Sequence, residues 1–302
     1  MMPSHLDPRM GKIIEAPVRE RISYILADRY LPYPRAERVI EEIDACLDRP
    51  STHRPKCLLI FGAPGVGKTM ILDEAWRRQQ ASCSPHQVSR PLVKISLGGV
   101  SDLRSLFGRI LRELDSPYSI KDRLVALYEQ ACFSIKARET QVLIIDELHN
   151  LLLHGSKIRE AMAVIRDLAN LPLSLVCAGT NAAWECIAAD PQLQHRFRCH
   201  ALNTWLETHE TRNILATLES RLPLRNPSGL ANSEMMPMLV RMSQGHPQTM
   251  ITAIREAGRD ALERGDEAIR ADVLKQALQR LLEEKYEAVI RDQFKPLKPS
   301  KS

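Results

Sequence analysis

An eight-residue phosphate-binding motif constrains this chain more than any other feature. Residues 57–61 (CLLIF) form an apolar run, and the sequence then reads GAPGVGKT from Gly62 to Thr69. An apolar strand followed by a G-x-x-x-x-G-K-T pattern and a helix is a P-loop. The alternative is a Gly/Pro-rich turn with an exposed lysine, which the full match disfavours. The sequence therefore predicts a nucleoside triphosphate as the first ligand.

Each residue type in the motif has a physical role. The glycines let backbone N–H groups converge on the phosphates, and the helix that begins near Lys68 adds its positive end. Lys68 supplies charge at the phosphates, and the Thr69 hydroxyl is suited to hold Mg²⁺. The predicted nucleotide-binding set is Gly62, Pro64, Gly65, Val66, Gly67, Lys68, Thr69, Met70 and Thr180.

A second apolar run ends in two carboxylates, Asp146 and Glu147, in the sequence QVLIIDE at residues 141–147. Ligands of open parallel sheets lie at the carboxyl ends of the strands. We therefore expect Asp146 beside the phosphates as a Mg²⁺ ligand, and Glu147 as the group that polarises the attacking water. Such a pair alone often only begins a solvated helix, so this interpretation depends on the P-loop.

Composition excludes several classes of protein. Hydrophobic residues make up 44% of the 302 residues and charged residues 26%, which excludes a disordered or fibrous chain. No apolar run approaches the ~18–20 residues that cross a bilayer, and the first residues, MMPSHLDPR, lack the apolar core of a signal peptide. We expect a cytoplasmic protein without a membrane partner. Seven cysteines without a C-x-x-C pair indicate reduced thiols and no zinc site.

Apolar runs alternate with helical segments, which indicates repeated βαβ units and an α/β fold whose parallel sheet carries helices on both faces. Besides the P-loop strand, strands are expected at 92–97, 141–146 and 173–178, and helices at 16–27, 34–47, 101–114, 121–138 and 156–170. From about Leu206 to Ile290 the pattern is helical. The expected domains are an N-terminal helical segment (1–50), a nucleotide-binding core (51–205), a helical lid (206–290) and a flexible basic tail (291–302).

Two further features refine the nucleotide site. Asn181 follows the strand at 173–178, where a polar side chain would lie between the two acids and the γ-phosphate; the alternative is a turn that tolerates asparagine. Arg196 lies in the sequence DPQLQHRFR at residues 190–198. In a P-loop enzyme that works as a ring or filament, an arginine here would enter the neighbour's active site. Arg198 is the second candidate, and a solvated surface arginine is the alternative.

With these motifs the chain resembles the AAA+ ATPases over about residues 20–270. Within them, the YPRAER segment from Tyr33, the LLIFG strand and the VCAGT strand end resemble the TniB family of transposition ATPases, related to TnsC and more distantly to IstB. The resemblance implies ATP-dependent assembly of a homo-oligomeric ring or filament on double-stranded target DNA. It also implies recruitment of a DDE transposase, with a target-selection factor as a possible further partner.

One position departs from the family pattern. The lid helix of the family often opens with Gly-x-Pro-Arg, whereas this chain has Gly245-His-Pro-Gln248. Gln248 cannot supply the charge that the arginine brings to the γ-phosphate. Arg255, seven residues further on the same helical face, is the candidate substitute. We therefore expect a weak or partner-stimulated ATPase in which ATP acts mainly as an assembly switch.

Contact with DNA is predicted from charge and position, and not from a sequence motif. The net charge of +5 and the pI near 8.8 permit nucleic-acid binding without proving it. The candidate contacts, near segments that line the channel of AAA+ rings, are Lys94, Arg104, Arg109, Lys157 and Arg159. Such contacts would be sequence-independent and salt-sensitive. For each residue the alternative is a solvated helix face.

The rival functions are an AAA+ remodeller of protein substrates and a signalling ATPase that acts without DNA. A channel loop with an aromatic-hydrophobic pair would favour protein threading, but residues 148–154 (LHNLLLH) contain no aromatic. The tail beyond Ile290 carries lysines and prolines and too few apolar residues to fold. It is expected to be either a flexible arm that recruits the transposase or an inert solubilising end.

Overall fold

A computed structural model of the chain describes residues 3–48, 55–82, 89–99, 102–119, 121–152 and 157–293, with side chains as far as residue 284. The chain forms two compact units. One combines Met1–Tyr33 with Thr204–Ser302, and the other is the continuous segment Pro34–Asn203. We refer to them as the helical unit and the α/β unit.

The α/β unit is built on five parallel strands. They are β1 (Cys57–Phe61), β2 (Leu92–Ser96), β3 (Val142–Asp146), β4 (Ser174–Gly179) and β5 (Phe197–Ala201), in the spatial order β2-β3-β4-β1-β5. Each pair of neighbours is parallel. Strand β3 is buried throughout and β1 at four of its five residues, as expected of a parallel sheet with two covered faces. The predicted α/β class is confirmed.

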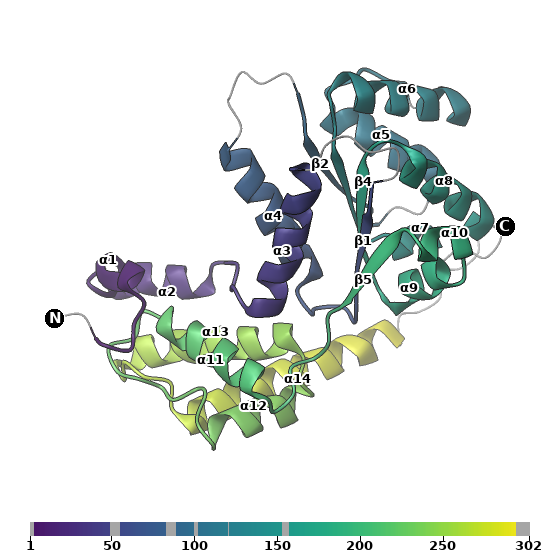
Figure 1. The fold of residues 1–302 in the computed structure, drawn as a ribbon. Coiled ribbons are helices and arrows are strands. Elements are labelled where there is room, and N and C mark those ends of the chain that lie inside the picture. The colour runs from purple at the N-terminus through teal and green to yellow at the C-terminus, as the bar shows by residue number, and fades with distance from the viewer. Residues whose placement is uncertain are drawn as a thin grey trace. The chain divides into compact units, whose positions relative to one another are not determined.

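Helices cover both faces of this sheet (Figure 1). On one face α3 (Pro34–Leu47) packs against α4 (Lys68–Ser82) and β3. On the other face α5 (Leu103–Glu113) packs against β2, α6 (Leu124–Ala137) packs on α5, and α8 (Ile158–Asn170) packs on β4. Three short helices lie beside the strand ends: α7 (His149–Leu152), α9 (Asn181–Ala188) and α10 (Pro191–Gln194).

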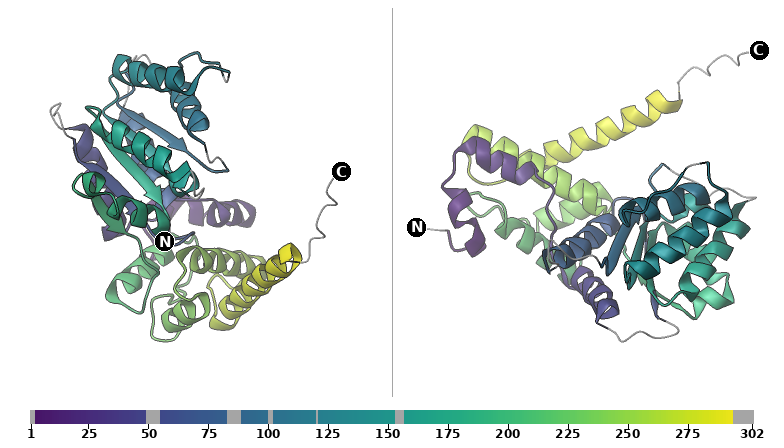
Figure 2. Two further views of the ribbon diagram at one scale, coloured as in Figure 1. Left: turned by 90° about the vertical axis from the view of Figure 1, so that its right-hand side faces the viewer. Right: turned by 90° about the horizontal axis from the view of Figure 1, so that it is seen from above.

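The helical unit combines the two ends of the chain. Its main helices are α2 (Val18–Leu26), α11 (His209–Ser220), α12 (Met235–Ser243), α13 (Pro247–Arg264) and α14 (Ala271–Gln293), with the short η1 (Pro8–Met10) and α1 (Gly11–Ile14). Helix α13 packs against both α2 and α14 (Figure 2). Gly258 of α13 lies at this contact, where a Cβ would touch the Cδ1 atom of Ile25 at 3.4 Å, an ordinary van der Waals distance.

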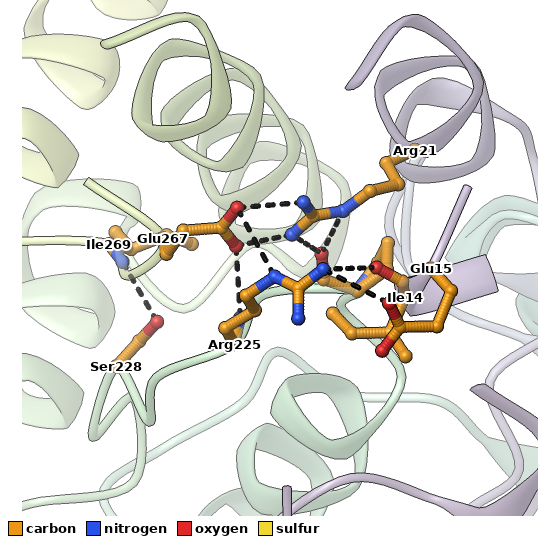
Figure 3. Close-up of polar contacts among 8 residues, drawn as sticks. Ile14, Glu15, Arg21, Arg225, Ser228, Glu267 and Ile269 are labelled. Atoms are coloured by element: carbon orange, nitrogen blue, oxygen red, sulfur yellow. Dashed lines mark hydrogen bonds and ion pairs between the residues drawn. The ribbon is translucent and has the colours of Figure 1, made fainter. Parts of the chain in front are cut away.

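A buried arginine ties α2 to this unit (Figure 3). Arg21 is 2% exposed, and its guanidinium forms an ion pair with Glu267. The Nε atom of Arg21 also donates to the carbonyl oxygen of Pro223 at 2.9 Å. Glu267 accepts a further hydrogen bond of 3.1 Å from the backbone N–H of Arg225. The α2 segment is therefore part of the helical unit.

The observed boundaries differ from the expected domains. Residues 1–50 are divided after Tyr33, since α3 belongs to the α/β unit and α2 to the helical unit. The reason is that the apolar face of α3, with Val39, Ile40 and Ile43 fully buried, is covered by α4 and β3. At the other end, α14 continues through Gln293, past the expected start of the tail at residue 291. Tail residues 294–302 lie outside the described residues.

Within the described part of the chain, no helix combines the length and the apolar character needed to cross a membrane.

Candidate nucleotide-binding site

The sheet order brings the predicted nucleotide motifs to one edge. The P-loop follows β1, Asp146 ends β3, and Thr180 follows β4. Strand β4 lies between β1 and β3, so Thr180 and Asn181 lie between the P-loop and the acids. The backbone N–H of Gly62 donates to the carbonyl oxygen of Gly179 at 3.3 Å, which joins the first turn of the P-loop to the end of β4.

The first glycine of the P-loop has no room for a side chain. Gly62 has a φ of 153°, and a Cβ there would lie 2.1 Å from the carbonyl oxygen of Leu202. Gly67 also has a positive φ, 98°, but a Cβ on Gly67 would meet no neighbouring atom within 4 Å. Both positions need a backbone that L-residues rarely adopt, and Gly62 needs space as well. Both positions therefore fit the glycine-dependent turn that the P-loop motif predicts.

Lys68 folds back over the loop. Its ammonium donates to the carbonyl oxygens of Gly62 and Ala63, each at 2.8 Å. Burial lowers the pKa of Lys68, while the carboxylates of Asp146 and Glu147 raise it. The Lys68 ammonium is therefore held by two neutral carbonyl oxygens of the loop. The charged oxygens of a phosphate would be stronger acceptors.

Thr69 and Asp146 form the predicted metal-binding pair. The Thr69 hydroxyl donates to Asp146 Oδ2 at 2.8 Å, and Asp146 is 2% exposed. The other carboxylate oxygen of Asp146 accepts the backbone N–H of Glu147 at 2.8 Å. A hydroxyl and a buried carboxylate within hydrogen-bonding distance are hard oxygen ligands of the kind that Mg²⁺ prefers. The donor set fits Mg²⁺.

Glu147 has a strained backbone. Its φ of 57° is left-handed, which costs a non-glycine residue about 1–2 kcal/mol. Its Oε2 atom lies 3.5 Å from Asn150 Nδ2, and the same amide donates to the carbonyl oxygen of Leu97 at 3.1 Å. A Cβ on Gly98 would lie 2.8 Å from Glu147 Oε2. Sequence reasoning missed Asn150 and Gly98. Asn150 reaches Glu147 through the left-handed turn that follows β3, and Gly98 reaches it because β2 pairs with β3.

His149 is the other unpredicted group at this edge. Its Nδ1 atom is buried and has no hydrogen-bond partner among the residues that the structure describes. Burial lowers the pKa of His149, against the opposing effect of the Glu147 carboxylate.

Thr180 and Asn181, both predicted to lie near the nucleotide, occupy the start of α9. Thr180 is the N-cap residue of α9 and is half-buried, and Asn181 is the first helical residue and is exposed. Their exposure leaves both side chains accessible to a ligand at the carboxyl edge of the sheet.

Arg196 lies at the opposite edge. It precedes β5, whose residue Phe197 pairs with Cys57 at the start of β1. The five residues of β1 separate this position from the P-loop, about 17 Å at 3.3 Å per residue. The guanidinium donates to the carbonyl oxygen of Ala169 at the end of α8. Arg196 therefore does not reach the phosphates of its own subunit. The second candidate, Arg198, is exposed and pairs with Glu42 at 3.3 Å.

Three of the five DNA-contact candidates, Lys94, Arg104 and Arg109, have partners within the α/β unit. Lys94 on β2 forms an ion pair with Asp73 of α4. Arg104 in the first turn of α5 donates to the carbonyl oxygen of Asp122.

Arg109 has internal partners, and Lys157 and Arg159 have none within the part of the chain that the structure describes. Arg109 donates to the carbonyl oxygens of Ser96 and Gly98, the second at 3.3 Å. Lys157 and Arg159, at the start of α8, are exposed, and no ion pair of either is found among the described residues. Lys157 and Arg104 also line a cavity of about 350 Å³ between the first turns of α5, α6 and α8. Of the five candidates, the two exposed cations without a described ion pair are therefore Lys157 and Arg159, at the start of α8.

In the helical unit, Gln248 is exposed in the first turn of α13. Arg255, the candidate substitute for the absent lid arginine, forms an ion pair with Asp28 at 2.7 Å. Its charge is therefore held at the end of α2 within the same unit.

A family model described as "Bacterial TniB protein" matches residues 21–207, more than half of the chain. No curated protein matches the chain.

Solved structures share the fold. The ORC1 protein of Aeropyrum pernix, solved in complex with DNA, is 18% identical with a TM-score of 0.67, covering 90% of this chain and 72% of that one. The ORC2 protein of Aeropyrum pernix, with ADPNP and ADP, is 14% identical with a TM-score of 0.61, covering 84% and 71%. Drosophila ORC bound to DNA is 17% identical with a TM-score of 0.61, covering 88% and 66%. The predicted AAA+ fold is thereby confirmed.

Proposed function

The chain belongs to the TniB family, and from that premise we propose that it is an ATP-dependent DNA-binding regulator of transposition. In this proposal it assembles on target DNA when ATP is bound and recruits a DDE transposase. The observation that carries the nucleotide part is the meeting of Lys68, Thr69 and Asp146 at one sheet edge, with Thr69 and Asp146 joined at 2.8 Å. Two AAA+ neighbours were solved with nucleotide or with DNA, which supports both ligands.

The residues at the edge have separable roles in hydrolysis. Lys68 would leave the carbonyl oxygens of Gly62 and Ala63 for the β- and γ-phosphates. Thr69 and Asp146 would hold Mg²⁺, which neutralises charge on the phosphate oxygens when bound. Glu147 would accept a hydrogen bond from the attacking water and polarise it. Asn181 would donate to the γ-phosphate from the end of β4.

Completion of the site requires a second subunit. Arg196 lies at the far end of β5 from its own P-loop, so its charge would serve a neighbour in a ring or filament. It must first leave the carbonyl oxygen of Ala169. Gln248 brings no charge from the lid, and Arg255 is paired with Asp28. The site therefore lacks the cation that a lid arginine would bring to the γ-phosphate. We expect slow hydrolysis, which a partner could stimulate.

DNA contact is assigned first to Lys157 and Arg159. Both are exposed, so neither must break an internal ion pair to reach a phosphate. Lys94, Arg104 and Arg109 would each give up an internal contact, which costs part of the energy gained. Two cations per subunit, repeated around an oligomer, supply enough phosphate contacts for salt-sensitive binding.

Light scattering of the protein with duplex DNA and ATP, a non-hydrolysable analogue or ADP tests the proposal. We expect DNA-bound oligomers with ATP and its analogue, and none with ADP. Lys68→Ala should abolish nucleotide binding and assembly, whereas Glu147→Gln should keep both and stop hydrolysis. Lys136→Ala, an exposed lysine of α6, is the matched control. Electron microscopy of the same samples distinguishes a ring from a filament.

The rival functions make a different prediction in this experiment. A remodeller or a signalling ATPase would assemble with ATP to the same extent whether or not DNA is present. The residues after the acid pair that the structure describes, 148–152 (LHNLL), contain no aromatic side chain, which disfavours a threading loop. If ATP causes the same assembly with and without duplex DNA, these rival functions are favoured.

A further inference from the structure

The turn between β2 and α5 lies directly against the acid pair. In the register of β2 and β3, Ser96 pairs with Asp146. The backbone N–H of Leu97 then donates to the carbonyl oxygen of Asp146 at 2.9 Å. Gly98 follows, and a Cβ there would meet Glu147 Oε2 at 2.8 Å. The turn at residues 97–99 thus forms one wall beside the carboxylate of Glu147.

Asn150 holds this turn from the side of β3. Its amide donates to the carbonyl oxygen of Leu97 at 3.1 Å and lies 3.5 Å from Glu147 Oε2. A single side chain therefore contacts both the turn and the carboxylate. Asn150 sits three residues after Glu147, in the short helix α7, so the left-handed backbone of Glu147 brings it into this position.

Arg109 holds the same turn from the side of α5. Its guanidinium donates to the carbonyl oxygens of Ser96 and Gly98, the residues on either side of Leu97. A planar guanidinium presents its N–H donors in a rigid fork, whereas the donors of an ammonium all radiate from one atom on a flexible stem. The geometry uses this property, which a contact to a DNA phosphate would not require.

Glu147 depends on such support. Residues with a left-handed backbone persist where the surrounding structure fixes them, and the carboxylate of Glu147 has close neighbours in Gly98 and Asn150. Loss of the Arg109 or the Asn150 side chain would remove hydrogen bonds that hold the turn at residues 97–99. The carboxylate of Glu147 could then move. Displacement by about 1 Å is enough to cost roughly 100-fold in rate.

We propose that Arg109 and Asn150 are positioning residues, which hold the turn at residues 97–99 so that Glu147 is fixed for hydrolysis, and that Arg109 is not a DNA contact. This inference rests on the proposed ATPase function. It assigns Arg109 a different role from the one that its charge alone suggests.

The test measures kcat and KM for ATP, nucleotide affinity and DNA affinity in Arg109→Ala, Arg109→Lys and Asn150→Ala. We expect kcat to fall by about 10- to 100-fold in all three, with nucleotide and DNA affinities within about twofold of wild type. Arg112→Ala, an exposed arginine on the same helix that contacts Tyr118, should match wild type. Asn213→Ala, an exposed asparagine of α11, is the control for Asn150.

Two outcomes would overturn the inference. If Arg109→Lys hydrolyses ATP like wild type while Arg109→Ala loses DNA affinity, Arg109 is a DNA contact. If Arg109→Ala lowers the residual rate further when Glu147→Gln is already present, its effect does not pass through Glu147. Failure of the proposed function looks different: wild type and Glu147→Gln would then hydrolyse ATP at the same background rate, and the inference would fall with it.

Discussion

The hydroxyl of Thr69 donates a hydrogen bond of 2.8 Å to the carboxylate of Asp146, 77 residues further along the chain. Thr69 lies in the first turn of α4 and Asp146 ends β3, so the bond joins the P-loop to the central strands of the sheet. A hydroxyl that already faces a buried carboxylate needs little movement to share a cation with it. The two oxygen atoms are therefore within reach of one cation.

Thr69→Val should separate metal-dependent chemistry from nucleotide binding. Valine keeps the shape of threonine but removes the hydroxyl that faces Asp146. We expect Mg²⁺-dependent ATP hydrolysis to fall by about 100-fold, as when one electrostatic stabiliser is removed. Affinity for ADP without Mg²⁺ should change by less than about threefold. Thr69→Ser is the matched control, and if serine fails as badly as valine, the hydroxyl is not the group that matters.

Gly62→Ala should destabilise the α/β unit more than Gly67→Ala does. Both glycines have a positive φ, but only Gly62 faces an obstacle, the carbonyl oxygen of Leu202 at 2.1 Å. Backbone strain alone costs about 1–2 kcal/mol, and overpacking adds about 1–3 kcal/mol. Urea denaturation without nucleotide, followed by circular dichroism, measures the difference. Equal losses in the two variants would show that the Leu202 carbonyl moves away freely.

Local sequence patterns predicted the helices and strands that form the nucleotide-binding edge of the sheet. The helix expected at 34–47 coincides with α3, and the strand expected at 92–97 is observed as Leu92–Ser96. Parallel pairing then requires strand ends to share an edge, so the P-loop and Asp146 could be brought together from sequence alone. The family resemblance is confirmed by the match to residues 21–207.

Tertiary contacts explain what could not be predicted. Periodicity shows that α3 has an apolar face but not which element covers it, so the division after Tyr33 was missed. A charge pattern likewise does not show which cation has an internal partner. Lys94 and Arg109 were indistinguishable from Arg159 in sequence, although the first two contact Asp73 and the backbone of Ser96.

Arg21→Met should destabilise the helical unit and remove part of its acid sensitivity. It removes the buried partner of Glu267, which keeps the N–H of Arg225 and an ion pair with its guanidinium. The cost should therefore lie at or below the lower end of the about 3–5 kcal/mol that breaking a fully buried pair costs. Hydrogen bonds from Arg21 lower the pKa of Glu267 below 4.5. Its contribution to stability is therefore full above pH 4.5 and is lost as the pH falls through the lowered value.

Chemical denaturation of wild type, Arg21→Met and Glu267→Gln between pH 3 and pH 7 tests this linkage. Stability of the wild type should fall more steeply below about pH 4.5 than that of Glu267→Gln. The exposed pair Arg270–Asp272 offers a control in Arg270→Met, which should destabilise the protein much less than Arg21→Met does. Parallel pH curves for wild type and Glu267→Gln would mean that the pair does not link stability to pH.

Lys157→Ala/Arg159→Ala should weaken DNA binding without changing nucleotide affinity. Wild-type affinity for duplex DNA in the presence of ATP should fall by about 10³- to 10⁵-fold between 50 and 200 mM salt if an oligomer makes 6–10 phosphate contacts. The double variant should show a shallower slope of affinity against salt. Lys121→Ala/Lys136→Ala removes the same charge from another part of the α/β unit. An equal change in that control would point to net charge and not to contact.

Arg196→Ala should bind ATP and fail to hydrolyse it, because its charge acts in a neighbouring subunit. The residue lies at the amino end of β5, whereas the P-loop follows the carboxyl end of the adjacent β1. Mixing experiments use this separation. Lys68→Ala subunits keep the arginine but lack the pocket, and Arg196→Ala subunits keep the pocket but lack the arginine. A mixture should recover hydrolysis that neither variant shows alone, up to about one quarter of the wild-type rate if subunits mix at random and pair freely. Arg198→Ala, with its exposed guanidinium on Glu42, is the matched control and should hydrolyse ATP by itself. If the mixture stays inactive although Lys68→Ala subunits are present in oligomers with Arg196→Ala subunits, Arg196 does not act across the subunit boundary.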